Sequence, residues 1–139
     1  MRIVLDTNVV VSALIWGGTP YKLIEAAARG DVDLCTSPAL LAELGGVLNR
    51  EHLARRLERQ RASVEEAIAL YAGLAVTMSP TNVQRVVPGD ADDDQVIATA
   101  IAAGAELIVT GDRDLLALRS HGNIRIVTPA EAARLIAIA

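Results

Sequence analysis

Residues 2–8 read Arg-Ile-Val-Leu-Asp-Thr-Asn, a short aliphatic run that ends in a carboxylate. A run of this length and composition is typical of a strand buried on both faces, the kind found in parallel sheets. A second run, Leu-Ile-Val-Thr-Gly-Asp at residues 107–112, also ends at an aspartate. In open parallel sheets, ligands bind beyond the carboxyl ends of the strands, where the strand order reverses. Asp6 and Asp112 are therefore expected to face one crevice if these two strands are neighbours.

The rest of the chain alternates strand patterns with helix patterns, which predicts an α/β fold with a parallel sheet. Asp92 or Asp93 is expected to cap the helix that ends at Gly104. Residues 79–91 are the least regular section. No internal repeat or linker divides residues 1–139, which predicts one domain. The expected strands are 2–5, 32–36, 75–78, 106–110 and 124–127, and the expected helices are 8–14, 20–29, 38–49, 51–61, 63–73, 93–103, 113–119 and one after 128–129.

The composition limits the function classes. Of the 139 residues, 52% are hydrophobic and 2% are aromatic, so the core is expected to consist of aliphatic side chains. The longest uncharged stretch, residues 7–21, is too short to span a membrane, and no signal-peptide hydrophobic region precedes Asp6, so a cytoplasmic protein is expected. The one cysteine, Cys35, is expected to be buried and inert. The net charge of −4 neither excludes nor indicates a nucleic-acid substrate.

Two further carboxylates lie on or beside the apolar faces of predicted helices. Glu43 follows Leu40 by three positions, and Asp94 shares its face with Ile97 and Ala98. A carboxylate in such a place is costly unless a cation meets it, and four clustered acids repel one another. Oxygen ligands in an open site favour Mg²⁺ or Mn²⁺ over Zn²⁺, which prefers His or Cys. The sequence therefore predicts a divalent metal site.

Each of these polar residues also has a plain structural explanation. Asp6 can end its strand in an Asx turn, and Glu43 can reach solvent from the edge of its helix. Asp114 is either a surface acid or a spare ligand. Asn8 and Thr110 either orient ligands or cap local backbone. The acids at the start of the 93–103 helix, Asp90, Asp92 and Asp93, are typical of solvated loop or capping residues.

A basic segment follows the third predicted helix. Five arginines, Arg50, Arg55, Arg56, Arg59 and Arg61, are opposed only by Glu51 and Glu58. This pattern indicates a solvated helical face, or a surface that contacts RNA phosphates or an acidic partner. Trp16, beside two glycines, either packs in the core or rim or stacks on a base.

The chain resembles the PIN domain family, especially bacterial toxin ribonucleases of the VapC type. The resemblance covers nearly the whole chain and is carried by four blocks at residues 4–9, 36–44, 92–98 and 107–115. It implies a three-layer fold in which a five-stranded parallel sheet of order 3-2-1-4-5 is flanked by helices. It also implies an Mg²⁺- or Mn²⁺-dependent endoribonuclease, often homodimeric, that an antitoxin inhibits. By position, the acidic quartet matches Asp6, Glu43, Asp94 and Asp112, the supporting polar residues match Asn8 and Thr110, and Asp93 and Asp114 stay open as further ligands.

Other readings fit less well. A haloacid dehalogenase-type phosphatase needs an aspartate two residues after the first, where this chain has Asn8. A response-regulator domain needs a lysine near a late strand, but Lys22 lies in an early helix. Phosphate-loop and dinucleotide fingerprints are absent. The main alternative to an active nuclease is a non-catalytic PIN-like module that binds RNA or protein.

Overall fold

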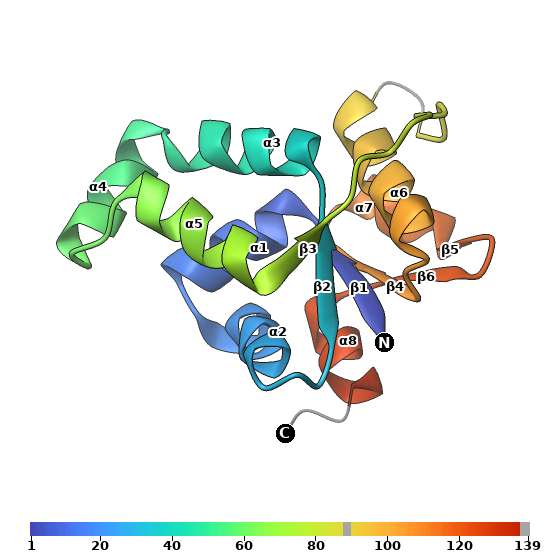
Figure 1. Cartoon of the computed structure of the whole chain (residues 1–139), viewed down its shortest axis with the longest axis horizontal. Helices are drawn as coiled ribbons and strands as arrows, with labels where there is room; N and C mark the ends of the chain where they lie inside the picture. Colours follow the sequence, from blue (N-terminus) through green and yellow to red (C-terminus); the bar gives the residue numbers. More distant parts are fainter. Residues whose placement is uncertain (88–89, 137–139) are drawn as a thin grey trace.

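The computed structural model describes residues 1–87 and 90–136, and its centre is a six-stranded sheet of order β3-β2-β1-β4-β6-β5 (Figure 1). Every neighbouring pair is parallel except β5 and β6. The expected parallel strands and their expected order are confirmed, with β6 as the fifth of them. The strands are β1 (Arg2–Leu5), β2 (Asp33–Thr36), β3 (Ala75–Thr77), β4 (Leu107–Val109), β5 (Ser120–His121) and β6 (Ile124–Val127).

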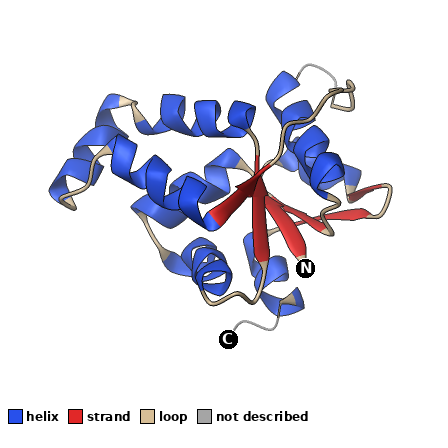
Figure 2. Cartoon of the chain, viewed as in Figure 1, coloured by secondary structure: helices blue, strands red, loops and turns tan. Residues whose placement is uncertain are grey.

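Helices connect the strands and cover both faces of the sheet (Figure 2). The connection between β2 and β3 is the longest helical one, and its three helices extend to one side of the sheet in Figure 1. The helices are α1 (Thr7–Ile15), α2 (Gly18–Ala28), α3 (Pro38–Leu48), α4 (Glu51–Arg59), α5 (Val64–Leu74), α6 (Ala91–Ala103), α7 (Arg113–Leu118) and α8 (Pro129–Leu135).

Alternating residues of the strands supply two aliphatic clusters, one on each face of the sheet. Ile3 and Leu5 of β1 pack with residues of α1, α2, α3, α4, α5 and α8. Val4, between them, belongs to the second cluster, with residues of α6 and α7. Successive side chains of a strand point to opposite faces, so a strand buried on both sides reads as a continuous apolar run. The expected helix–sheet–helix layers and the buried Cys35 are thus confirmed.

Two details differ from the sequence-based expectations. The sheet has a sixth strand, because the two residues of β5 form a hairpin with β6 through a turn at Gly122, which has a positive φ. Helix α6 is capped by Asp90 and not by Asp92 or Asp93. The irregular section at 79–91 holds no helix or strand before α6 in its described part, and residues 88 and 89 lie outside the described residues.

Within the described ranges, no helix has the length and apolar character needed to cross a membrane.

Candidate metal centre

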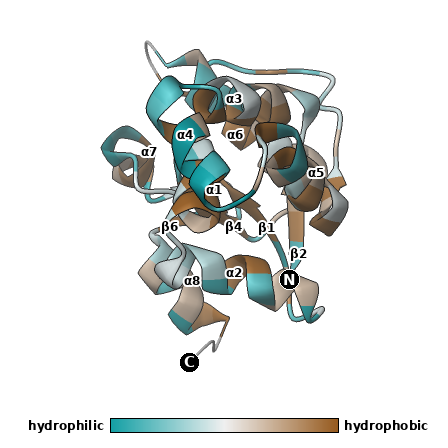
Figure 3. Cartoon of the chain, turned by 90° about the vertical axis from the view of Figure 1, so that its left-hand side faces the viewer, coloured by the Kyte–Doolittle hydropathy of each residue, from teal (hydrophilic) through white to brown (hydrophobic). Residues whose placement is uncertain are grey.

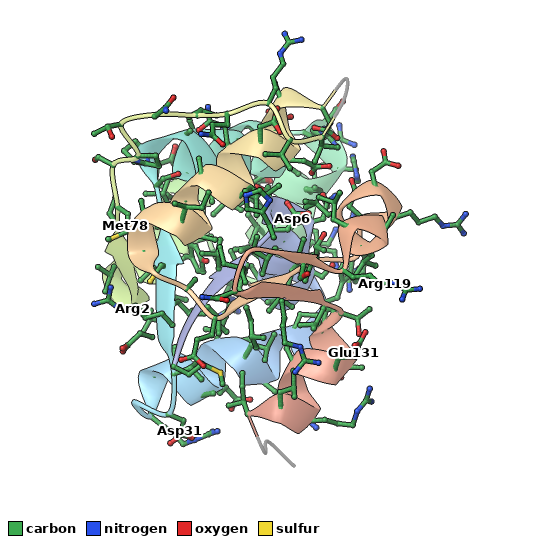
Figure 4. The ribbon with its side chains drawn as sticks, turned by 90° about the vertical axis from the view of Figure 1, so that its right-hand side faces the viewer. Arg2, Asp6, Asp31, Met78, Arg119 and Glu131 are labelled. Atoms are coloured by element: carbon green, nitrogen blue, oxygen red, sulfur yellow. The ribbon has the colours of Figure 1, made fainter. Side chains whose placement is uncertain are left out.

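Asp6 is the residue at which β1 becomes α1. Its backbone N–H donates to the Val109 carbonyl of β4 at 2.9 Å, and its carboxylate caps α1 by accepting from the Thr7 N–H at 2.8 Å. The other carboxylate oxygen accepts from the Thr110 hydroxyl at 2.7 Å. Asp6 is only 6% exposed, so its position is fixed by the sheet and by three hydrogen bonds. Figure 4 shows it inside the molecule.

Asp112 lies beside Asp6 because Thr110 contacts both residues. The Thr110 hydroxyl accepts from the Asp112 N–H at 2.9 Å while it donates to Asp6. The Asp112 Oδ1 caps α7 by accepting from the N–H groups of Asp114 and Leu115 at 2.8 and 3.4 Å. The strands β1 and β4 are neighbours, as the expected crevice required. The sequence-based expectation that Asp6 and Asp112 share one edge of the sheet therefore holds, and Thr110 links them.

The start of α6 brings two more carboxylates to Asp112. One oxygen each from Asp90, Asp93 and Asp112 lie within 4.8 Å of one another. Asp90 is held by its role as N-cap, since its Oδ1 accepts from the Asp93 N–H at 3.1 Å. Asp93 is 4% exposed, and its Oδ2 is buried with no hydrogen-bond partner among the described residues. An unpaired buried carboxylate oxygen is costly, and a cation would compensate it.

Asp94 has a different environment from Asp93. Its Oδ1 accepts from the N–H groups of Val86 and Val87 at 2.7 and 2.8 Å, which ties the loop before α6 to the helix. These hydrogen bonds lower the pKa of Asp94, and Arg85 lowers it further. Asp94 is not among the three acids that lie within 4.8 Å. The structure thus brings Asp93, and not Asp94, to Asp112.

Glu43 of α3 lies near enough to the same acids to interact with them electrostatically. Its side chain is half-buried, and this burial raises its pKa. Asp92, Asp6 and Asp90 raise the pKa further, while the nearby Thr7 hydroxyl lowers it. That hydroxyl is itself buried, and no residue in the described ranges forms a hydrogen bond with it. Glu43 is therefore electrostatically part of the cluster although its carboxylate makes no hydrogen bond in the described part of the chain.

The cluster has a strong excess of negative charge. Burial, followed by repulsion from Asp112, Asp90 and Asp6, raises the pKa of Asp93 to about 8. Burial also raises the pKa of Asp6, and its hydrogen bonds from Thr110 and Thr7 offset part of this effect. The ion pairs found among the described residues, Arg29–Asp31 and Arg55–Glu51, lie elsewhere. Hard oxygen ligands with an orphaned buried oxygen and no neighbouring ion pair fit a divalent cation such as Mg²⁺ or Mn²⁺.

The remaining candidates fall outside this cluster. Asn8 is exposed on α1, and Asp114 is exposed at the start of α7, where only its N–H contacts Asp112. Arg50, Arg55, Arg56 and Arg59 lie at α4, at the end of the molecule away from α6 and α7 (Figure 1). The acidic quartet predicted from the sequence did not include Asp90 and Asp93. One sequence feature could have indicated them: an aspartate three residues before another is typical of the capped start of a helix.

Comparison with known proteins gives one family match and several similar structures. A family model described as PIN domain matches residues 2–114. MJ1680, an uncharacterized protein of Methanocaldococcus jannaschii, is 29% identical over 94% of this chain and 88% of its own length.

The similar solved structures share the fold at low sequence identity. One chain of VapBC2 from Rickettsia felis, solved bound to a DNA fragment from their promoter, has a TM-score of 0.61 and 17% identity, over 91% of this chain and 97% of that chain. FitAcB from Neisseria gonorrhoeae gives a TM-score of 0.58 and 20% identity, over 92% of this chain and 98% of that chain.

Proposed function

The chain belongs to the PIN domain family, and we propose that it is a metal-dependent endoribonuclease, the toxin of a type II toxin–antitoxin pair. The observation that carries the proposal is the group of Asp90, Asp93 and Asp112, in which one oxygen of each carboxylate lies within 4.8 Å of the others. One buried oxygen of Asp93 is also unpaired within the part of the chain that the structure describes. Members of this family are generally nucleases. We therefore assign this group, with Asp6 beside it, to a divalent metal.

The proposed ligands are Asp93, Asp112 and Asp6, with Glu43 and Asp90 completing the shell of acids. Asp93 takes the role expected for Asp94, because the Asp94 Oδ1 already accepts two backbone hydrogen bonds. When bound, Mg²⁺ or Mn²⁺ would lower the pKa of a water and offset charge on a phosphodiester. The Thr110 hydroxyl would hold the site together, because it donates to the Asp6 carboxylate and accepts from the Asp112 backbone N–H. Asn8 is proposed only as a substrate contact, because its side chain is exposed.

A protein antitoxin is the second part of the proposal. The similarity in fold to a chain of VapBC2 and the sequence resemblance to VapC-type ribonucleases both favour a protein antitoxin. The homodimer and the cytoplasmic location stay predictions. Arrest of bacterial growth by the wild-type protein, but not by the Asp93→Asn variant, would support the toxin role; unchanged growth with both would contradict it.

Cleavage of end-labelled single-stranded RNA tests the nuclease directly. With Mg²⁺ or Mn²⁺ we expect cleavage by the wild type, none in EDTA, and none by Asp93→Asn. Asp94→Asn is the matched variant, one residue away, and it should still cleave, because an asparagine oxygen can accept the two backbone hydrogen bonds. Loss of cleavage in Asp94→Asn with activity retained in Asp93→Asn would instead make Asp94 the ligand.

The same experiment separates the enzyme from a non-catalytic module. A metal-dependent rise of the melting temperature in the wild type, absent in Asp93→Asn, reports the metal site without any need for activity. That rise without cleavage of any RNA would favour the PIN-like binding module. Cleavage that persists in EDTA would contradict the metal-dependent mechanism.

A further inference from the structure

We propose that the outer face of α4, together with Trp16, binds single-stranded RNA and guides it to the acidic edge; this inference rests on the proposed ribonuclease function. The proposal combines three observations. Positive charge is concentrated on one helix, an indole ring is exposed against that helix, and a polar stripe of α1 connects the ring with Asp6.

The charge of the chain is strongly segregated. Residues 50–61 contain five arginines and two glutamates, a net charge of +3, whereas the whole chain carries −4. The remaining residues therefore carry −7. Helix α4 buries Leu53 and Leu57, whereas Arg55 and Arg59 are exposed. In Figure 3 this helix has mainly the hydrophilic colour. Of the five arginines, only Arg55 forms an ion pair among the described residues, with Glu51.

Trp16 gives this basic surface an aromatic platform. It follows α1 and is 61% exposed, an unusual position in a chain with only three aromatic residues. The Arg56 guanidinium lies over its ring, 4.1 Å from the centroid. The Gln60 side chain donates to the Ile15 carbonyl at 3.1 Å, which fastens the end of α4 to the end of α1. The indole is thus held by a cation, and it remains largely exposed to solvent.

One stripe of α1 leads from the acids to this platform. Asn8, Ser12 and Trp16 recur every four residues, so they lie on one face of the helix. Asn8 and Trp16 are exposed and Ser12 is half-buried, while the residues between them are mostly buried. The ten residues from Asp6 to Trp16 correspond to about 15 Å of helix, a distance that a few nucleotides of RNA can span. No side chain on this stripe is charged, so nothing on it repels a phosphate backbone.

Single-stranded RNA fits this surface better than an acidic protein does. Protein interfaces usually bury several apolar anchors, but Trp16 is the one large hydrophobic side chain that the α4–Trp16 surface exposes among the described residues. Single-stranded nucleic acid supplies phosphates for arginines and unstacked bases for an aromatic ring. The acidic edge, in contrast, attracts RNA only through its metal. The α4–Trp16 surface would therefore supply the attraction that the acids lack.

Trp16 is the only tryptophan, so its fluorescence reports on this surface without a label. We expect a short single-stranded oligoribonucleotide in EDTA to quench the Trp16 emission saturably, and added salt to weaken the effect. In anisotropy measurements with labelled RNA, Trp16→Ala should bind roughly five- to a hundredfold more weakly, the usual cost of losing a base-stacking ring. Arg59→Ala should bind several-fold more weakly and reduce the slope of log K against log salt by about 0.7.

Arg134→Ala is the matched control, since Arg134 is an exposed arginine on α8, and its RNA affinity should equal that of the wild type. Melting curves of each variant exclude unfolding. Metal-dependent RNA cleavage without any change in Trp16 emission, and with normal affinity in Arg59→Ala, would overturn this inference but not the ribonuclease. Quenching by RNA without cleavage would leave the surface in place and count against the nuclease. Quenching by an oligoglutamate peptide but not by RNA would overturn it in favour of an acidic protein partner.

Discussion

Replacing Asp93 with asparagine is expected to stabilise the metal-free protein and to abolish its response to metal. Burial and three neighbouring acids raise the pKa of Asp93 from 3.8 to about 8. At pH values between these two pKa values, Asp93 keeps its proton in the folded protein and releases it in the unfolded chain. The contribution of Asp93 to stability is therefore greatest at low pH and falls as the pH rises from about 4 to about 8. Asparagine carries no charge at any of these pH values and avoids this loss.

The size of the effect follows from the pKa difference. At about 1.4 kcal/mol for each pKa unit, the interval from the unfolded pKa of Asp93 to pH 7 corresponds to a loss of about 4 kcal/mol in the free energy of unfolding. Asp90 and Asp112 are only half-buried, and solvent screens their repulsion, so we expect about half of this, or about 2 kcal/mol. For a chain of this length the melting temperature of Asp93→Asn would then lie about 7 °C above that of the wild type at neutral pH. Near the pKa of the unfolded aspartate the two proteins should melt together.

Thermal unfolding followed by circular dichroism in EDTA, at several pH values, measures this difference. Asp114→Asn is the control, because Asp114 is an exposed acid outside the cluster, and it should not show the growing difference. Addition of Mg²⁺ or Mn²⁺ should stabilise the wild type but not Asp93→Asn. The reasoning is refuted if Asp93→Asn melts below the wild type at mildly alkaline pH without metal, or if the wild-type stability does not fall over this range.

Three further substitutions, one of them with a matched control, test the framework of the site and the fold. Thr110→Val removes a buried hydrogen bond to the Asp6 carboxylate and should lower the free energy of unfolding by about 2 kcal/mol in denaturant titrations; an unchanged midpoint would contradict the bridging role. Gly104→Ala places a side chain at φ +62°, where α6 ends, and should cost about 1 kcal/mol, whereas Gly73→Ala, at an open position inside α5, should be neutral or stabilising. Leu48→Ala, at a fully buried position, should cost about 3 kcal/mol by the same measurement, and a loss below that of Gly104→Ala would show that α3 is loosely packed.

The sequence was sufficient for the fold because the strands are short, apolar and separated by well-marked helices. The run at residues 2–5 predicted β1 to the residue, and the prolines after Ser37 and Thr128 marked the starts of α3 and α8. The hairpin strand β5 was missed because it has two residues and no apolar run. Local pattern carries no signal for so short an edge strand.

The candidate site was predictable where backbone topology decides it. Asp6 and Asp112 come directly after neighbouring parallel strands, so their proximity follows from the strand order alone. Asp93 and Asp94 are a harder choice, because they are adjacent on a helix and each lies three or four residues from Ile97. The two aspartates differ because two N–H groups of the loop before α6 donate hydrogen bonds to the Asp94 carboxylate. That contact is tertiary and leaves no trace in helix periodicity.

Asp6 is the single residue between β1 and α1, and its carboxylate caps α1. A fluctuation that displaces the backbone of Asp6 therefore breaks its hydrogen bond to β4 and removes the cap of α1 in the same event. Sites carried by surface loops open locally at little cost, but this one belongs to the cooperative unit formed by the central strands. Its amide should accordingly be among the slowest in the molecule to exchange with deuterium. The contribution of Asp6 to the acidic edge is thus tied to the opening of the core itself.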